Sequence, residues 1–272
     1  MGHDREESSV RRAGYRGIAD SIRDAIEAGD LPPGTELDTS KGLAEKYNVA
    51  PGTALQALRQ LATDGYITLR PKKKAIVRER PEAVIVVRDR HAYRDEIGYY
   101  FDQNAKSWRA IGKPHLGLAP APNHVADMLG VPRGANVIVR DRAMGPADSI
   151  QPLQLATSYI PMPLATEVPL VGEANSGPGG IYDRFEEHFQ APLEWRETIS
   201  SRLPNEEEQR RLGVHSSVPL LIVTRESRVR RGSEEVTAEV NETRMAAEQF
   251  AVSYTVERDE SARWPREERP AS

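Results

Sequence analysis

The stretch that decides the fold is "LAEKYNVAPGTALQALRQLATDGYITLRPKKKAIV", residues 43–77. Apolar residues recur at helical spacing in its first two segments, and only a few residues separate these segments. Two short apolar runs then flank three consecutive lysines, which is the pattern of two antiparallel strands joined by a turn. Two helices joined by a tight turn and followed by a hairpin predict a winged helix-turn-helix.

Local signals place the ends of three helices. The first predicted helix ends at Gly29, and two prolines and a glycine in "LPPGTEL" follow it. Thr39 or Ser40 can cap the second helix, and Pro51 suits the first turn of the third, which ends at Gly65. The apolar residues that we expect on the inner sides of these helices are Ile18, Ile22, Ala25, Ile26, Leu43, Ala44, Tyr47, Ala54, Leu58 and Leu61.

Positive charge is concentrated in the same part of the chain. The net charge is −4, yet residues 41–80 contain nine lysines and arginines against three acids. Residues 1–40 and 81–272 both carry more acids than bases. Such a block is either an ordinary solvated face or a surface for a polyanion, and its coincidence with a winged helix-turn-helix favours double-stranded DNA.

Residues 15–80 resemble the DNA-binding domain of the GntR family of bacterial transcription regulators. The resemblance is carried by "LPPGTEL", "LAEKYNV", "GTALQALRQLATDGYI" and the hairpin after them. It implies that the third helix enters the major groove and that the hairpin reaches the neighbouring backbone or minor groove. The family usually has a capping hydroxyl and arginines at the start of the third helix, where this chain has Ala50, Pro51 and Leu55, so direct arginine readout is reduced.

Thr53 and Gln56 remain on the outward face of the third helix and can contact bases. The Gln56 amide can bond adenine bidentately, while Leu55 and the Thr53 methyl group can contact a thymine methyl. Without a hydroxyl at Ala50, the N–H groups of this helix start can bind a phosphate oxygen or water. The wing lysines suit phosphates better than bases. The predicted DNA-binding residues are Lys41, Pro51, Gly52, Thr53, Leu55, Gln56, Arg59, Arg70, Lys72, Lys73 and Lys74.

The remainder of the chain alternates strand-like and helix-like segments. The strand-like segments are "ANVIVRDRAM", "LQLATSYIP", "VPLLIVTRESRV", "VTAEVNETRM" and "QFAVSYTVERD". The helix-like segments are "NHVADMLG", "GGIYDRFEEHF" and "NEEEQRRLG". Antiparallel strands with a few helices predict an α+β domain.

These segments resemble the effector-binding domain named UTRA, found in the HutC subfamily of GntR regulators, whose fold is similar to chorismate lyase. The resemblance rests on "VIVRDRAM", "LATSYIP", "GGIYDRFEEHF", "EEEQRRLGV", "PLLIVTRES" and "FAVSYTVERD", and covers most of residues 91–258. We therefore predict a DNA-binding domain at 13–80, a linker at 81–92 and a UTRA-type domain at 93–258. The first dozen residues and residues 259–272 are expected to be disordered by composition.

Two arginines mark the predicted effector site. Arg140 and Arg142 are two apart on a strand and so share a face, and two guanidinium groups on one inner face need an anion. The resemblance implies that both line the effector site with Ser158, which suggests an acidic or phosphorylated ligand. Alternatively, both arginines face solvent or pair with acids on neighbouring strands, namely Glu226, Glu239 or Glu242.

Weaker assignments surround this site. Tyr159 and Arg244 are weaker effector-site candidates, because Tyr159 fits the core better and Arg244 fits the surface better. The family often has a carboxylate where this chain has Ala156, and its loss disfavours a sugar or amino-sugar ligand recognised through that acid.

Enzymatic and membrane functions find no support in the sequence. There is no cysteine, the six histidines are scattered, and no zinc, phosphate-loop or nucleophile-elbow motif occurs. We therefore expect no catalytic residue, no metal and no cofactor. No apolar run reaches about 18 residues and the N-terminus lacks a signal-like apolar stretch, which predicts a cytoplasmic protein without a membrane partner.

The combined prediction is a homodimeric repressor that a small-molecule effector releases from a palindromic DNA operator. Dimerisation through the second domain is implied by the resemblance alone. The alternative is a small-molecule-binding scaffold or degenerate enzyme whose basic head binds nucleic acid without sequence preference.

Overall fold

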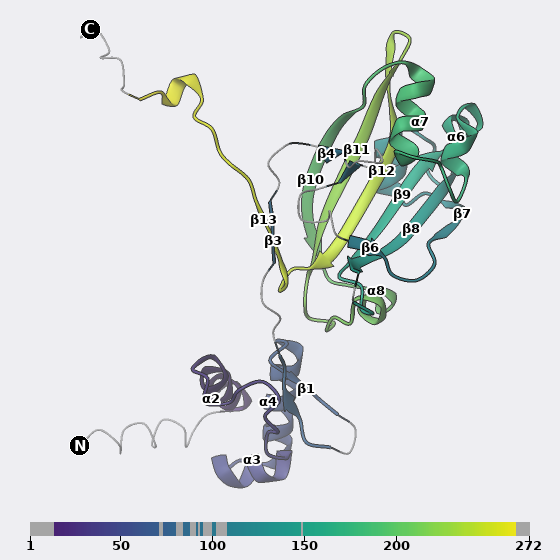
Figure 1. Ribbon diagram of the computed structural model, residues 1–272. Coiled ribbons are helices and arrows are strands. Elements are labelled where there is room, and N and C mark those ends of the chain that lie inside the picture. The colour runs from purple at the N-terminus through teal and green to yellow at the C-terminus, as the bar shows by residue number, and fades with distance from the viewer. Residues whose placement is uncertain are drawn as a thin grey trace.

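The computed structural model of this 272-residue chain describes residues 14–70, 73–79, 84–87, 91, 93–94, 100–101, 108–147 and 149–264. Figure 1 shows a small unit of helices with a hairpin, and a larger unit in which helices pack on a broad sheet. The α+β class and the two predicted architectures are thus confirmed. No helix in these described ranges is both long and apolar enough to cross a lipid bilayer.

The helical unit contains α2 (Tyr15–Glu27), α3 (Ser40–Tyr47) and α4 (Pro51–Thr63). Thr39 caps α3, because its Oγ1 accepts a hydrogen bond from the N–H of Gly42 at 3.2 Å. Asn48 then adopts the left-handed conformation (φ 51°), which turns the chain sharply into α4. The three predicted helices are confirmed.

These helices and the hairpin share one core. Its buried members are Ile18, Ala19, Ile22, Leu37, Leu43, Ala44, Ala54, Ala57, Leu58, Leu61, Ile67, Ala75 and Val77. Three residues expected in it, Ala25, Ile26 and Tyr47, are only half-buried. The stripe Ala54, Leu58 and Leu61 is fully packed, so the opposite face of α4 is left for another molecule.

The hairpin is the predicted wing, with shorter strands than expected. Strands β1 (Ile67–Thr68) and β2 (Ile76–Val77) pair antiparallel. The other edge of the wing receives residues 34–37, whose Leu37 N–H donates to the carbonyl of Ala75 at 2.9 Å. The stretch between α2 and α3 therefore stabilises the base of the wing as well as ending α2.

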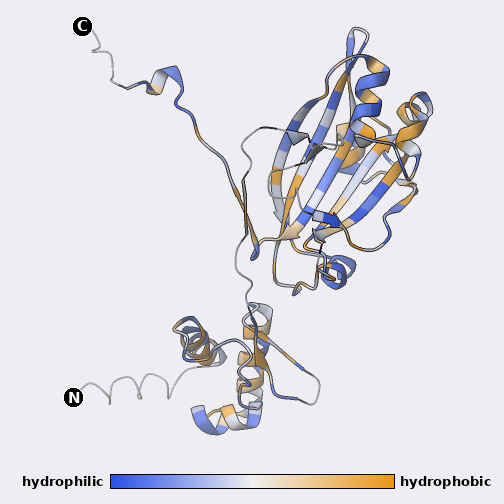
Figure 2. Ribbon diagram, viewed as in Figure 1, coloured by the Kyte–Doolittle hydropathy of each residue, from blue (hydrophilic) through white to orange (hydrophobic). Residues whose placement is uncertain are grey.

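Seven antiparallel strands form the large sheet, in the order β10-β11-β12-β9-β8-β6, with β7 also paired to β8. They are β6 (Trp108–Ala110), β7 (His115–Pro120), β8 (Asn136–Pro146), β9 (Gln154–Pro161), β10 (Glu194–Arg202), β11 (Leu220–Arg231) and β12 (Glu234–Ala246). Hydrophilic and hydrophobic residues alternate along several of these strands in Figure 2, because successive side chains of a strand point to opposite faces of the sheet.

Helices cover both faces of this sheet. On one face, α6 (Met162–Glu167), the 3₁₀ helix η2 (Pro169–Gly172) and α7 (Gly180–Phe189) enclose a core that includes Ile160. On the other face lie α5 (Asn123–Leu129), packed against Tyr159, and α8 (Glu206–Leu212), packed against Leu155. The predicted segments for α5, α7 and α8 are confirmed, whereas α6, η2, β6, β7 and β10 were not predicted.

Short strands join the beginning and the end of the larger unit. Strand β3 (Val84–Val87), within the predicted linker, pairs parallel with β13 (Phe250–Ser253), and β4 (Tyr93–Arg94) pairs antiparallel with β5 (Tyr100–Phe101). The last predicted strand segment, "QFAVSYTVERD", runs to Asp259, but the strand ends at Ser253.

The C-terminal segment after β13 explains this difference. Tyr254 and Val256 are 53% and 77% exposed, so burial does not favour a longer strand here, and a short 3₁₀ turn, η3 (Glu260–Ala262), follows. Residues 259–264, which we expected to be disordered, contain this turn, whereas the rest of that expectation, residues 1–12 and 265–272, lies outside the described residues.

Candidate functional site

The outward face of α4 carries most of the residues predicted to contact DNA. Gly52, Leu55, Gln56 and Arg59 are exposed, and Thr53 is half-buried beside them. Leu55 is 37% exposed, which leaves it available to a groove. The two remaining predicted residues of the helical unit, Pro51 and Lys41, are also exposed.

The start of α4 offers fewer hydrogen-bond donors than expected. Ala50 provides no side-chain cap, and Pro51 has no N–H. The N–H groups of Thr53 and Ala54 donate to the carbonyl oxygen of Ala50 at 2.9 and 3.3 Å. Binding of a phosphate at this helix start therefore stays a prediction that rests on the N–H of Gly52.

The cations of the wing fall into two kinds. Lys73 and Lys74 are exposed, and Lys72 lies outside the described residues. Arg70 instead stabilises the wing, because its Nη2 lies 2.7 Å from Glu36 Oε1 and its Nε donates to the carbonyl of Lys74 at 3.0 Å. That Arg70 contacts DNA stays a prediction, and such a contact would compete with Glu36 and the Lys74 carbonyl for its guanidinium group.

On the face of the large sheet covered by α7, three predicted effector residues come together. Arg140 lies opposite Ser158 in the β8–β9 register, and Arg142 Nη2 lies 3.4 Å from Ser158 Oγ. Asn241 Nδ2 donates to the same oxygen at 3.0 Å. The Nε atom of Arg142 is buried and has no hydrogen-bond partner among the described residues, so it is a donor suited to an anion.

Sequence reasoning missed Asn241. It stands in the predicted strand "VTAEVNETRM", but only the pairing of β12 with β9 places it opposite Ser158. Its Oδ1 accepts a hydrogen bond from Thr243 Oγ1 at 3.1 Å, which fixes the orientation of the amide.

Arg140 differs from Arg142 in what it contacts. Its Nη1 donates to the carbonyl of Val171 at 3.0 Å and also to the carbonyl of Glu173. Both carbonyls belong to η2 or the residue after it, so Arg140 holds this covering segment against the sheet.

The acids named as alternative partners of these arginines have other contacts. Glu226 pairs with Arg228 at 2.9 Å, and Glu242 with His124 at 2.8 Å. The buried Glu239 accepts a hydrogen bond from Ser227 Oγ at 2.9 Å.

Tyr159 and Arg244 do not lie with the other effector candidates. Tyr159 is adjacent to Ser158 in β9 and therefore points to the opposite face, where it packs in the core beneath α5. Burial, reinforced by the negative charge of Glu242, raises the pKa of Tyr159 to about 12. Arg244 occupies the same opposite face, where only 13% of its side chain is exposed, so it is not a surface residue either.

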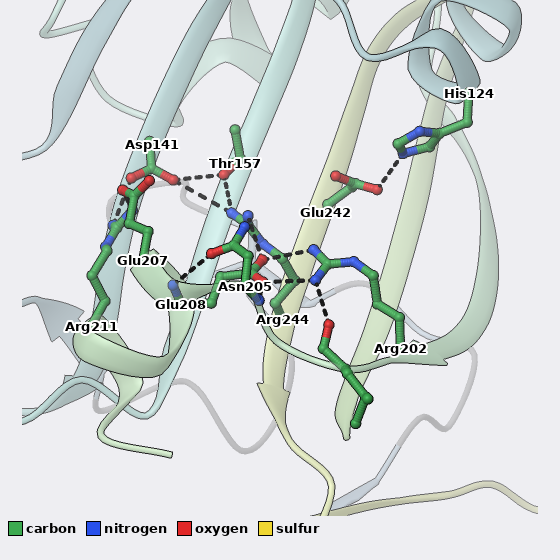
Figure 3. A network of polar contacts seen from close by, with 11 residues as sticks. His124, Asp141, Thr157, Arg202, Asn205, Glu207, Glu208, Arg211, Glu242 and Arg244 are labelled. Atoms are coloured by element: carbon green, nitrogen blue, oxygen red, sulfur yellow. Dashed lines mark hydrogen bonds and ion pairs between the residues drawn. The ribbon is translucent and has the colours of Figure 1, made fainter. Parts of the chain in front are cut away.

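Arg244 belongs to a network of polar side chains centred on Glu208 of α8 (Figure 3). Arg202 donates to both carboxylate oxygens of Glu208 at 2.7 Å, and Arg244 Nη1 lies 3.3 Å from Oε1. The N–H groups of Glu208 and Asn205 each donate to the other residue's side chain at 2.9 Å, which forms a capping box.

Electrostatics keeps Glu208 charged although it is almost completely buried. Burial by itself would raise the pKa of Glu208. The hydrogen bonds from Arg202 and from the N–H of Asn205, with the charges of Arg202 and Arg244, outweigh burial and lower that pKa below its ordinary value.

A second part of the network ties α8 to the central strands. Arg211 Nη2 lies 2.6 Å from Asp141 Oδ2, and Asp141 Oδ1 accepts a hydrogen bond from Thr157 at 2.6 Å. Arg244 also donates to the Thr157 hydroxyl. These contacts fasten α8 to the sheet on the face opposite the Arg142 cluster, although Arg244 Nε is buried without a hydrogen-bond partner among the described residues.

In the part of the chain that the structure describes, no three histidine, aspartate or glutamate side chains gather in a way that could hold a metal ion.

Comparisons with known proteins agree with both units. Residues 14–77 match the family model described as "Bacterial regulatory proteins, gntR family", and residues 115–251 match the model of the UTRA domain. The transcriptional regulator GgaR of Escherichia coli (strain K12) is 24% identical over 222 residues, which are 77% of this chain and 78% of GgaR. The transcriptional repressor NagR of Bacillus subtilis (strain 168) is 23% identical over 227 residues, 80% of this chain and 86% of NagR.

A solved structure shares the fold. The crystal structure of a GntR-family transcriptional regulator superposes with a TM-score of 0.64 and 24% identity, covering 92% of this chain and 100% of the other.

Proposed function

Because this chain belongs to the GntR family of bacterial regulatory proteins and carries a UTRA domain, it is a transcriptional regulator, and we propose that it acts as a ligand-released repressor. In this proposal a homodimer binds a palindromic operator and leaves it when a small anionic effector occupies the UTRA domain. The name of NagR as a repressor supports this sign of regulation. We also propose a non-enzymatic, cytoplasmic protein with the domain limits 13–80, 81–92 and 93–258.

The observation that carries the DNA-binding proposal is the exposed face of α4 beside a wing with exposed lysines. Lysines on the wing neutralise phosphates and so supply affinity without sequence information, whereas Gln56 and Leu55 present groups that distinguish base pairs. Two copies related by a twofold axis would read half-sites about one helical turn apart.

Changing Gln56 to alanine is expected to relax sequence preference at one base pair of each half-site. The lost amide removes a bidentate contact, so discrimination against a wrong base at that position should fall by about 1–3 kcal/mol. Binding of the variant to an operator set with each base pair replaced in turn would measure this.

The matched control is Gln60→Ala in the same helix. The Gln60 amide donates to Asp64 at 2.8 Å, so it serves the helix end, and its loss should leave base preference unchanged. If both variants lose preference at the same base pair, Gln56 is not the residue that reads it.

For the effector, we propose an anionic group held by Arg142 with Ser158 and Asn241, under a cover held by Arg140. The Nε of Arg142, which is buried and has no partner in the part of the chain that the structure describes, supports an anion, and Ala156 supplies no acid for a sugar hydroxyl. The Arg142→Ala variant should bind the operator as the unchanged protein does but lose release by an anionic effector, with at least about a tenfold higher effector concentration required. Screening anionic metabolites for operator release, first with the unchanged protein and then with this variant, checks the assignment. An effector that releases both equally would place the anion elsewhere.

A footprint tests the function as a whole. The purified protein should protect an inverted repeat in the DNA beside its own gene, at physiological salt and with excess random competitor. A diffuse footprint that the competitor abolishes would call for genome-wide selection of bound fragments. If that selection enriches no sequence either, the protein binds nucleic acid without sequence preference and the repressor proposal fails.

A further inference from the structure

Arg78, just after strand β2, contacts both units of the chain. Its Nη2 lies 2.6 Å from Oε1 of Glu248, which stands in the turn between β12 and β13. Its Nη1 donates to the carbonyl of Gly65, two residues beyond the end of α4, at 3.2 Å. The side chains of Arg78 and Glu248 are only 14% and 19% exposed, so solvent screens this ion pair weakly.

A second contact lies beside the first. Gly65 has φ +78°, and a Cβ added there would lie 2.8 Å from Ser217 Oγ. Ser217 belongs to the loop between α8 and β11, and both its hydroxyl and its N–H bond His215 Nδ1, at 2.8 and 3.2 Å. Burial and the nearby charge of Arg78 lower the pKa of His215, with Glu248 opposing, which favours the neutral ring that accepts these bonds. The end of α4 therefore abuts the larger unit where only glycine fits.

The loop that contacts Gly65 is connected to the candidate effector strand. It follows α8 directly, and α8 is tied through Arg211 to Asp141 at 2.6 Å. Asp141 is the residue between Arg140 and Arg142 in β8. The carbonyl of Arg211 also accepts a hydrogen bond from Gln151 at 2.8 Å, which fixes the last turn of α8.

We propose that Arg78 is a positioning residue that couples the orientation of α4 to the UTRA domain through Glu248 and Gly65. The inference rests on the proposed function, because it names the contact by which an effector would change the spacing of the DNA-reading helices. Arginine suits this role, since its planar fork bonds a carboxylate and a carbonyl at once, whereas lysine offers a single point charge. Coupling between two binding sites is reciprocal, so binding of DNA to α4 must also alter the UTRA domain through the same contact.

DNA can therefore serve as the probe, without knowledge of the effector. Hydrogen exchange of the full-length protein is measured with and without a duplex selected by this protein from random sequence. We expect the duplex to change the exchange rates of residues 213–219 and 246–249 about fivefold or more, beside its protection of α4. In Arg78→Gln the change at α4 should remain, while the change in the two UTRA segments should disappear.

Three further variants separate coupling from a general loss of structure. Glu248→Gln should behave as Arg78→Gln does, and Arg16→Gln, which removes an exposed arginine from the same domain, should behave as the unchanged protein. The double variant Arg78→Glu, Glu248→Arg should regain part of the DNA-induced change in the two UTRA segments, because the ion pair is restored with its charges exchanged.

Two results would overturn the inference. The first is a DNA-induced change in the exchange rates of residues 213–219 and 246–249 that persists in Arg78→Gln. The second is the absence of that change in the unchanged protein although DNA protects α4. If selection enriches no sequence, the proposed function fails, and the contact is then tested with random duplex at low salt.

Discussion

Replacing Lys72, Lys73 and Lys74 together with alanine is expected to lower the affinity for every DNA duplex by about two to three orders of magnitude near 0.1 M salt. Each lysine that neutralises a phosphate releases about 0.9 of a counterion, so three contacts lower the slope of log affinity against log salt by about 2.7. Lys73 and Lys74 are exposed on the wing and available for such contacts. Titration of specific and random duplexes at several salt concentrations measures both quantities.

The control for this triple change removes three positive charges elsewhere. Arg196, Arg210 and Arg230 are exposed in the larger unit, and their joint replacement by alanine changes the net charge equally. It should leave the salt slope within about 0.5 of its original value, because these side chains lie outside the proposed DNA surface. Equal losses in both triple variants would show that net charge, not the wing, supplies the affinity.

The Glu208→Gln variant is expected to destabilise the UTRA domain by about 3 kcal/mol. Glutamine keeps the shape of the side chain but removes the charge that compensates Arg202 and Arg244. Glu208 and Arg244 are 3% and 13% exposed, whereas Arg202 is 46% exposed and therefore partly screened by solvent, which places the expected cost at the lower end of the range for buried pairs. Removing one partner of a buried ion pair typically costs about 3–5 kcal/mol, and for a domain of this size that lowers Tm by roughly 10 °C. Urea or thermal unfolding at pH 7 would measure the difference.

The difference in the free energy of unfolding between Glu208→Gln and the unchanged protein should depend on pH. The pKa of Glu208 is lowered in the folded protein, so its stabilising contribution is complete above about 4.5, its unfolded value, and is lost as pH falls through the folded pKa. The stabilities of Glu208→Gln and the unchanged protein should therefore converge in acid. Glu207→Gln is the control, since this carboxylate is 65% exposed and 3.5 Å from Arg211, and about 0.5 kcal/mol or less is expected. Equal stability of Glu208→Gln and the unchanged protein at pH 7 would mean that the network contributes nothing.

The helical unit could be predicted closely because its signals are local. A hydroxyl cap, a helix-starting proline and apolar residues at helical spacing lie within a few residues of what they determine. Strand β10 was missed for the opposite reason. Its sequence "EWRETISSR" is mostly exposed, so burial imposes no alternation, and only hydrogen bonding to β11 makes it a strand. The parallel pair β3–β13 joins segments far apart in the chain, which no local pattern reveals.

For the candidate effector site, strand periodicity was enough to place Arg140 and Arg142 on one face and to separate Ser158 from Tyr159, but it could not place the residues of β12. Ser158 and Tyr159 are consecutive in β9 and cannot share a face, so the two-residue period already separates them. Asn241 and Arg244 required the register of β12 against β9, which depends on packing across the whole sheet.

The pairing of β3 with β13 bears on the construction of chimeric regulators. The strand β3, in the proposed linker that leads into the UTRA domain, is hydrogen-bonded to β13, the last strand of that domain, with Val84 opposite Phe250 and Val87 opposite Ser253. A transplanted sensor that starts at residue 84 but stops after β12 would leave its incoming strand without a partner. The module that can be exchanged is thus bounded by the paired strands β3 and β13, and a transplanted segment should include both of them or neither.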